Sequence, residues 1–219
     1  QIINCRGVAV DVDLVGGALE LDTAARTEYL REAAALSGLE NPNSVGKLTK
    51  WLQTELKEED IPNLNKATVT ELLGKDLSSE DARRMLELRQ ELGKTSNKKY
   101  NALETAVCAD GRVRGLLQFY GAARTGRWAG RIVQPQNLPR TYIKSELLPL
   151  ARELVEDRQM DALKVVFGSV PDTLSQLIRT ALVAAPGCTL VDADFSSIEA
   201  RVIAWLAGEE WALEGFRTH

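Results

Sequence analysis

The chain has 219 residues, of which 44% are hydrophobic and 26% are charged, a composition typical of a folded globular protein. No stretch approaches the roughly 20 apolar residues of a membrane span. The N-terminus lacks the basic region followed by an apolar core that is typical of a signal peptide. We therefore expect no membrane partner and a cytoplasmic location. The chain begins with Gln1 rather than Met, which indicates a fragment or a processed protein.

The cysteines are odd in number and far apart, at Cys5, Cys108 and Cys188, so they form neither a disulfide framework nor a zinc pattern. We expect reduced cysteines within the core. The single histidine, His219, is the last residue, so catalysis by histidine within this chain is not expected.

The net charge of −4 argues against nucleic-acid binding until it is mapped along the chain. Residues 94–140 hold nine Lys and Arg against two acidic side chains, a charge of +7, which leaves −11 for the rest. A basic segment on an acidic body is typical of a surface that follows DNA. A basic run taken alone is more often only a solvated face.

The first half of the chain is predicted to be helical. Apolar residues recur at helical spacing over 12–37, and Gly38 followed by Pro42 is a usual stop signal. Ser78, with Asp81 three residues later, resembles a helix cap. The predicted elements are helices at 12–37, 44–55, 67–73, 78–93 and 96–108, with an exposed loop at 57–65.

The pattern changes after Gly111. Residues 112–120 resemble a strand, and residues 121–140, rich in Gly, Arg, Gln and Pro, indicate an ordered loop of the kind that often carries binding residues. Helices are predicted within 143–181, a buried strand at 188–194, a helix at 196–207 and a short last helix around Trp211. The expected fold class is α+β, mainly α, with a small antiparallel sheet.

Asp194 lies at the end of the predicted strand, with Glu199 five residues later on a helix that is apolar over most of its surface. Such a helix is usually buried, and buried charges need partners. Carboxylates in this arrangement are typical of a two-metal phosphoryl-transfer site that holds Mg²⁺. From this pattern alone, a structural ion pair on a core helix is an equally good interpretation.

The longer run Asp194-Phe-Ser-Ser-Ile-Glu-Ala-Arg201 resembles motif A of the family A DNA polymerases, the group of bacterial DNA polymerase I, whose pattern is Asp-Tyr-Ser-Gln-Ile-Glu-Leu-Arg. Phe195, Ser197 and Ala200 depart from that pattern. Phe195 keeps the aromatic ring without its hydroxyl, whereas Ser197 is shorter than the family's Gln, which puts any DNA contact there in doubt.

Three upstream segments also resemble the family. Arg124-Thr-Gly-Arg-Trp-Ala-Gly-Arg-Ile-Val-Gln-Pro-Gln-Asn-Leu-Pro-Arg140 matches its Thr-Gly-Arg stretch and the following Gln-Asn-Ile-Pro. Arg6–Asp11 with Asn43–Leu48, and Lys94–Tyr100, resemble parts of the polymerase thumb, the second being the segment that touches duplex DNA. A helical insert at 141–180 is similar to extra sequence in phage members, which favours the phage or prophage branch.

The resemblance implies two domains. Residues 1–111 would form a mainly helical thumb, and residues 112–219 part of a palm, with the insert at 141–180 and the motif A strand and helix at 187–207. The family's fingers helix and its His-Asp-Glu turn, which supplies the second catalytic carboxylate, do not occur in this sequence. The expected function is therefore that of a fragment of a DNA-directed DNA polymerase, inactive alone.

By the same resemblance, Asp194 is the catalytic carboxylate and a ligand of two Mg²⁺ ions in the full-length enzyme. The backbone carbonyl of Phe195 is a further metal ligand, and Glu199 excludes a ribose 2′-OH at the nucleotide sugar. Asp192, two residues before Asp194, is interpreted as a structural residue or as one that supports the metal ligands without binding the metal itself. The expected partners are primer–template DNA and deoxynucleoside triphosphates, and the expected DNA-binding residues are Lys94, Ser96, Asn97, Lys98, Arg127, Gln136, Asn137 and Arg201.

Two alternatives remain open. One is a non-catalytic DNA-binding protein that retains the thumb. The other is a metal-dependent nuclease that uses Asp192, Asp194 and Glu199 with carboxylates such as Glu209, Glu210 and Glu214. For Arg112, Arg114 and Arg131, solvation at the surface is as good an interpretation as DNA contact. A strand left unpaired by truncation favours association, so a dimer of this chain would be interpreted as an artefact of truncation.

Overall fold

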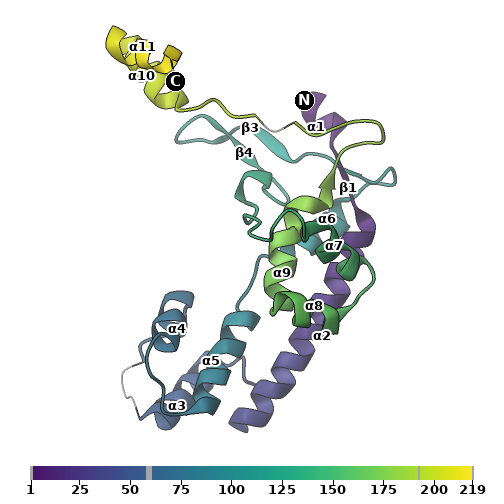
Figure 1. Cartoon of the computed structure of the whole chain (residues 1–219), viewed down its shortest axis with the longest axis vertical. Helices are drawn as coiled ribbons and strands as arrows, with labels where there is room; N and C mark the ends of the chain where they lie inside the picture. The colour runs from purple at the N-terminus through teal and green to yellow at the C-terminus, as the bar shows by residue number, and fades with distance from the viewer. Residues whose placement is uncertain (1, 58–60, 192, 219) are drawn as a thin grey trace. The chain divides into compact units, whose positions relative to one another are not determined.

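The computed structural model describes residues 2–57, 61–191 and 193–218. The chain divides into two compact units, Gln1–Ala185 and Pro186–His219, which are treated separately below (Figure 1). The fold is mainly helical with small antiparallel sheets, as the sequence predicts. Among the described residues no helix is both long enough and apolar enough to span a bilayer. Gln1, the acidic residues 58–60, Asp192 and His219 lie outside the described residues, so the interpretations of Asp192 and His219 have no structural counterpart here.

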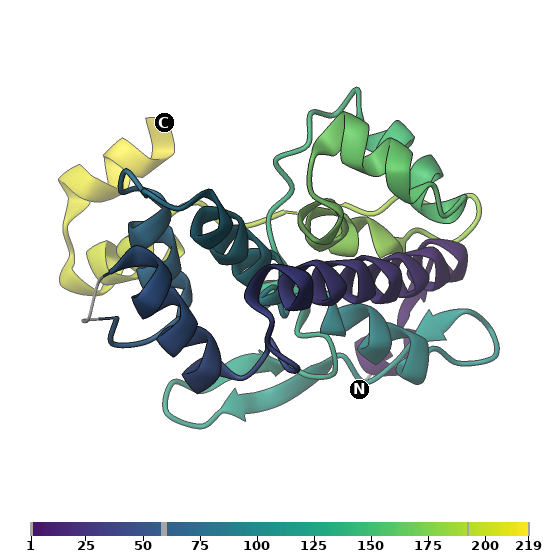
Figure 2. The ribbon, with the colours of Figure 1, turned by 90° about the horizontal axis from the view of Figure 1, so that it is seen from below.

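The long helix α2, Val12–Ser37, organises the first unit and confirms the prediction for residues 12–37. The Asp11 side chain caps its start by accepting a hydrogen bond from the backbone N–H of Leu14, and Gly38 ends it in the left-handed conformation. Its buried stripe packs against helices from both halves of the unit (Figures 1 and 2). The buried residues of α2 are Leu14, Val15, Gly17, Ala18, Leu21, Ala25, Tyr29 and Ala33.

Four helices follow α2, close to their predicted positions: α3 Val45–Leu56, α4 Lys66–Leu73, α5 Glu80–Leu92 and α6 Lys98–Ala106. The cap of α5 is Ser79, whose hydroxyl accepts from the Ala82 N–H, rather than the predicted Ser78. The prediction of an exposed loop at 57–65 is correct only in part: Pro62 and Asn63 are exposed, but Ile61 and Leu64 are buried in the core and anchor that segment.

The predicted helical insert forms α7 Leu148–Glu156, α8 Met160–Phe167, α9 Val170–Leu177 and the 3₁₀ turn η2 Ile178–Ala181. Helices α7 and α9 pack on α2, which the two views show from different directions (Figures 1 and 2). Gly17 makes this packing possible, since a Cβ there would collide with the backbone carbonyl of Val155 in α7.

A three-stranded antiparallel sheet joins distant parts of the first unit, in the order β2-β1-β5. Ala9 of β1 (Val8–Val10) pairs with Arg112 of β2 (Arg112–Val113) and with Val183 of β5 (Leu182–Val183). The sequence does not predict β1, β5 or the short helix α1 (Ile2–Arg6), because elements as short as these show no periodicity.

The strand predicted at 112–120 is two strands, since the chain bends at Gly115, whose φ is 72°. The second, β3 (Leu117–Ala122), forms a hairpin with β4 (Arg127–Gly130), so the prediction that 121–140 holds no regular element is wrong. The short 3₁₀ turn η1 (Pro135–Asn137) follows. The ladder is irregular between Gln118 and Ala122.

The three cysteines are unpaired, but all of them are exposed, which corrects the prediction that they belong to the core. Cys5 lies on the short helix α1, which buries no residue, and Cys188 lies in an extended segment. In both places no second apolar layer covers the side chain.

The second unit contains α10 (Ile198–Ala207) and α11 (Glu210–Thr218), which confirms the two helices predicted there. The strand predicted at 188–194 is not formed: its described residues are extended without a ladder, and Val191 is 86% exposed. A strand needs a neighbouring strand to satisfy its backbone, and the described residues of this unit provide none. The prediction that the apolar helix 196–207 is buried is also wrong, since Trp205 is 69% exposed.

Candidate nucleic-acid interface

The segment between α5 and α6 is held against α2 by an arginine that the sequence analysis did not single out. Arg26 donates to the carbonyl oxygens of Leu92 (3.1 Å) and Lys94 (2.7 Å), and its Nε binds Asp22. These two carbonyls belong to the end of α5 and the turn after it, where backbone acceptors lack helical partners. Arg26 and Asp22 are therefore positioning residues for the predicted DNA-binding segment 94–98.

Within that segment the predicted residues have different environments. Asn97 is 1% exposed and donates to Asp22 Oδ1 at 2.7 Å and to the Pro171 carbonyl at 3.4 Å. Its Oδ1 has no hydrogen-bond partner among the described residues. In this conformation Asn97 is part of the interior, whereas Lys98 on the first turn of α6 is exposed. In this conformation the Asn97 side chain is not exposed to solvent, and its phosphate contact stays a prediction from the family resemblance.

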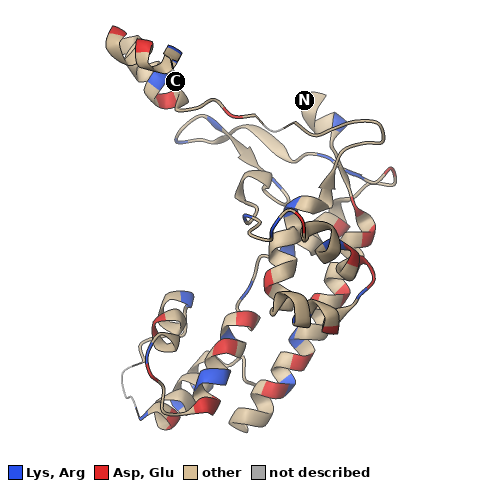
Figure 3. Cartoon of the chain, viewed as in Figure 1, with Lys and Arg blue, Asp and Glu red and all other residues tan. Residues whose placement is uncertain are grey.

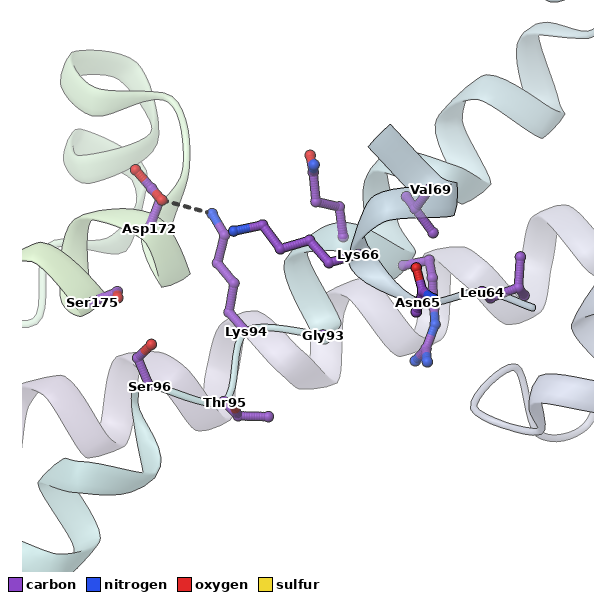
Figure 4. A pocket seen from close by; sticks show the side chains of 12 residues that line it. Leu64, Asn65, Lys66, Val69, Gly93, Lys94, Thr95, Ser96, Asp172 and Ser175 are labelled. Carbon is purple, nitrogen blue, oxygen red and sulfur yellow. Dashed lines mark hydrogen bonds and ion pairs between the residues drawn. The ribbon is translucent and has the colours of Figure 1, made fainter. Parts of the chain in front are cut away.

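Lys94 is engaged by carboxylates. Its Nζ lies 2.9 Å from Asp172 Oδ1 on α9, as Figure 4 shows. It also lies 3.1 Å from Glu91 Oε1 on α5. Neither acid is predicted as part of the site. The pairing with Asp172 joins residues that are 78 positions apart, so no local pattern indicates it. A phosphate at Lys94 would have to compete with these two carboxylates.

A cleft of about 530 Å³ opens beside Lys94, between α4, the α5–α6 turn and α9. Lys66 of α4 extends into the same space, and Ser96 lines it (Figure 4). Three cationic and several hydroxyl or amide groups thus face one hollow, with Asp172 as the acidic exception. The full lining is Leu64, Asn65, Lys66, Val69, Arg89, Gln90, Gly93, Lys94, Thr95, Ser96, Asp172 and Ser175.

Two residues of α6 connect this region to the next. The Tyr100 hydroxyl is buried and donates to the Leu174 carbonyl of α9 at 2.7 Å, and burial raises the pKa of Tyr100 well above its usual value of 10.0. Lys99 donates to the Val133 carbonyl at 2.7 Å, and partial burial lowers the pKa of its ammonium group. Lys99 thereby fixes the loop that leads into η1.

The loop after β4 presents the predicted amides. Gln136 and Asn137 are both exposed on η1, and Asn137 donates to Gln134 Oε1 at 3.0 Å. The amide of Gln136 lies against Gly130, where a Cβ would displace it from this position. Arg127 is exposed at the start of β4. The fold therefore keeps Arg127, Gln136 and Asn137 at the surface of one short stretch of chain.

Two arginines of the basic segment have structural partners. Arg112 donates to the carbonyls of Arg6 and Gly7, and Arg114 donates to that of Cys5, so both bind the C-terminal end of α1. Arg114 also forms a bidentate pair with Asp110, which lowers the pKa of that carboxyl to about 2. These contacts support a structural role for Arg112 and Arg114 better than they support DNA contact.

In the second unit the predicted catalytic residues are exposed. Asp194 and Phe195 lie in the extended segment before α10, and Phe195 is 78% exposed. Glu199, in the first turn of α10, is also exposed, which corrects the expectation that this helix and its charged side chains are buried. The reason is the same as for the missing strand: in the described part of this unit no second layer lies over these residues.

Arg201 joins the two helices of this unit. Its Nε donates to the Ser196 carbonyl at 2.7 Å, one of its amino groups donates to the Phe216 carbonyl at 3.0 Å, and its guanidinium lies 4.6 Å from the Phe216 ring centroid. These contacts use both of its donor edges. The geometry accounts for Arg201 as a residue that holds α11 against α10.

No group of three or more His, Cys, Asp or Glu side chains that could hold a metal ion occurs in the part of the chain that is described. The acids considered for a nuclease have other partners: Glu209 accepts from Trp211 Nε1, and Glu214 pairs with Arg217. No observation in the structure favours the nuclease alternative.

The comparisons with known proteins agree with the residues quoted from the sequence. The family model described as DNA polymerase family A matches residues 18–219. The DNA polymerase of Bacillus phage SP02 is 53% identical over 219 residues, which are 100% of this chain and 33% of that protein. The chain thus spans about a third of the length of this curated relative, and the expected likeness to phage members is confirmed. The chain belongs to DNA polymerase family A.

Proposed function

We propose that this chain is the thumb and the first part of the palm of a DNA-directed DNA polymerase, and that its own task is to hold primer–template DNA. The observation that carries the proposal is the match to a phage DNA polymerase along the whole of the chain. Residues 1–111 correspond in this proposal to the thumb and residues 112–219 to the partial palm. The full-length protein would add deoxynucleotides to a primer, using deoxynucleoside triphosphates in the host cytoplasm.

The grip on DNA is assigned to residues that the structure exposes. Lys98 supplies a cation for the phosphate backbone, which positions a duplex without reading its sequence. Arg127, Gln136 and Asn137 carry the donors suited to minor-groove acceptors, which all base pairs share, so they would sense the shape of the primer end. Ser96 and Lys94 line the neighbouring cleft and complete the phosphate contacts.

Asp194 is proposed as the catalytic carboxylate that the chain contributes to a two-Mg²⁺ site, together with the Phe195 carbonyl, while Glu199 restricts the sugar of the nucleotide. Support comes from the family match, which includes these residues. The family's second catalytic carboxylate does not occur in this sequence, and one carboxylate cannot hold two metal ions, so the chain alone is expected to be inactive.

DNA binding tests the proposal directly. A fluorescent primer–template is titrated with the chain at several salt concentrations, beside the double variant Lys98→Ala, Arg127→Ala. Each lost phosphate contact should reduce the magnitude of the slope of log K against log salt by about 0.9, so loss of the Lys98 contact should make the variant slope shallower by about one unit. The matched control is Lys144→Ala, Arg217→Ala, which removes the same charge outside the proposed grip. Equal slopes for all three proteins would contradict the proposed grip.

Primer extension tests the second part. The purified chain with Mg²⁺ and all four deoxynucleotides should extend no primer, and Asp194→Ala should behave identically. Extension by the chain that disappears in Asp194→Ala would show a complete active site and overturn the proposed inactivity.

A further inference from the structure

The β3–β4 hairpin carries an exposed group of aromatic side chains, named here the hairpin aromatic cluster: Phe119, Tyr120 and Trp128. They are 71%, 58% and 49% exposed, respectively. The chain has only 12 aromatic residues, so a quarter of them lie on this one hairpin. Large exposed apolar groups that lie together indicate a binding surface rather than chance exposure.

The cluster is ordered by its own contacts. The Phe119 and Trp128 rings are 5.3 Å apart at an interplanar angle of 71°, and Phe119 lies 6.3 Å from Tyr120. The Tyr120 ring lies against Gly126, where a Cβ would approach it to 2.9 Å. In an edge-to-face pair one ring contributes only its edge, so its faces remain available to a further planar group.

The charge around the cluster selects the kind of partner. Residues 112–140 include six arginines and no Asp or Glu. In Figure 3 the charged residues of the hairpin are blue, which marks Lys and Arg, and none is red. Arg124, Arg127 and Arg131 flank the aromatic residues, and all three are exposed. A protein partner with an apolar face would have to cover these guanidinium groups, whereas a nucleic acid offers phosphates for them and bases for the rings.

The geometry points to an unpaired base of single-stranded DNA as the occupant: we propose that the β3–β4 hairpin stacks such a base on Phe119 and Trp128. Bases inside a duplex are already stacked on both faces, so only an unpaired or terminal base has a face to offer. Aromatic rings beside a basic groove are the means by which single strands are held without sequence preference. This inference rests on the proposed function, since it takes DNA as the ligand.

The test separates stacking from charge. Fluorescence anisotropy compares a labelled oligothymidylate with an oligomer of the same length and charge made of abasic sites. Stacking is worth about 1–3 kcal/mol per base, so the chain should bind the oligothymidylate at least about fivefold more tightly. In Phe119→Leu, Trp128→Leu the affinity for oligothymidylate should fall to the abasic level, while the abasic affinity stays unchanged. The matched control is Trp205→Leu, Trp211→Leu, which removes two exposed aromatic residues elsewhere and should keep the preference.

A second readout does not depend on affinity. The fluorescence of Trp128, obtained by subtracting the spectrum of Trp128→Leu, should be quenched by oligothymidylate and not by the abasic oligomer. Equal affinity of the parent chain for both oligomers, or a preference that survives in the hairpin variant, would overturn the stacking site but leave the DNA grip standing. Failure of both oligomers and of primer–template to bind would overturn the proposed function as well.

Discussion

The ammonium group of Lys94 lies 2.9 Å from the carboxylate of Asp172, across the gap between the α5–α6 turn and α9. This pair places a negative charge within a cleft whose other charged lining residues are cationic. The segment that contains α9 therefore reduces the positive charge of the surface that is proposed to bind DNA.

Asp172→Asn should tighten primer–template binding and make the salt slope steeper by up to about one unit, because Lys94 loses one competitor for a phosphate. The side chain keeps its size, so the change acts through charge. The control is Asp161→Asn on α8. The Asp161 side chain is 95% exposed, and its carboxylate lies as far as 4.0 Å from the ammonium group of Lys164. If both variants strengthen binding equally, only net charge is responsible.

Asn97→Ala separates the two roles considered for this residue. The structure predicts a loss of stability of about 1–3 kcal/mol, since the buried amide loses its bonds to Asp22 and Pro171. Urea unfolding measures this loss. DNA affinity of the folded variant should stay near that of the parent, in contrast to Lys98→Ala. Weaker DNA binding with unchanged stability would instead support the phosphate contact that the family resemblance implies.

Tyr100→Phe should lower the free energy of unfolding by about 1 kcal/mol, because the Leu174 carbonyl loses its buried donor. The variant should also weaken the alkaline pH dependence. Burial raises the pKa of Tyr100, so the unfolded chain loses this proton first, and its contribution to stability is present below pH 10.0 and lost above it. Urea unfolding at pH 8 and above pH 10 measures both effects. The control is Tyr142→Phe, since Tyr142 is 79% exposed. A parent and variant with the same alkaline loss would contradict the assignment.

Arg201→Ala should release α11 from α10, because the guanidinium group bonds to the carbonyl of Ser196, just before α10, and to that of Phe216 in α11. Amide hydrogen exchange over residues 210–218 should become faster, while exchange in α2 stays as in the parent. Arg217→Ala, which removes a more exposed arginine of α11, is the control. Unchanged exchange together with weaker DNA binding would return Arg201 to the predicted DNA-binding set.

Local signals made the helices predictable. The caps at Asp11 and Gly38 and the apolar spacing between them are all within 30 residues of one another, so the bounds of α2 follow from the sequence. The hairpin was missed because Gly and Arg interrupt its alternation, and because Tyr120 takes a positive φ of 50° that no propensity indicates.

The environment of the candidate site was less predictable than its residues. The burial of Asn97 depends on Asp22, which is 75 positions away, and the pairing of Lys94 depends on Asp172, which is 78 positions away. The apolar run before Asp194 predicts a buried strand, but burial also requires a neighbouring layer, and the described residues of the second unit supply none. Family resemblance identified Asp194 and Arg127 by their motifs, and no local pattern pointed to Arg26.

The pairing of Ala9 with both Arg112 and Val183 also sets an order of events during synthesis. The strand β1 leaves the ribosome long before β5, so its second edge has no partner until residues 182–183 have emerged. Until then, β1 is an open sheet edge, which can pair with other chains. Helix α2 can form and gather its neighbours meanwhile, but the first unit can close only after nearly all of its sequence has been made.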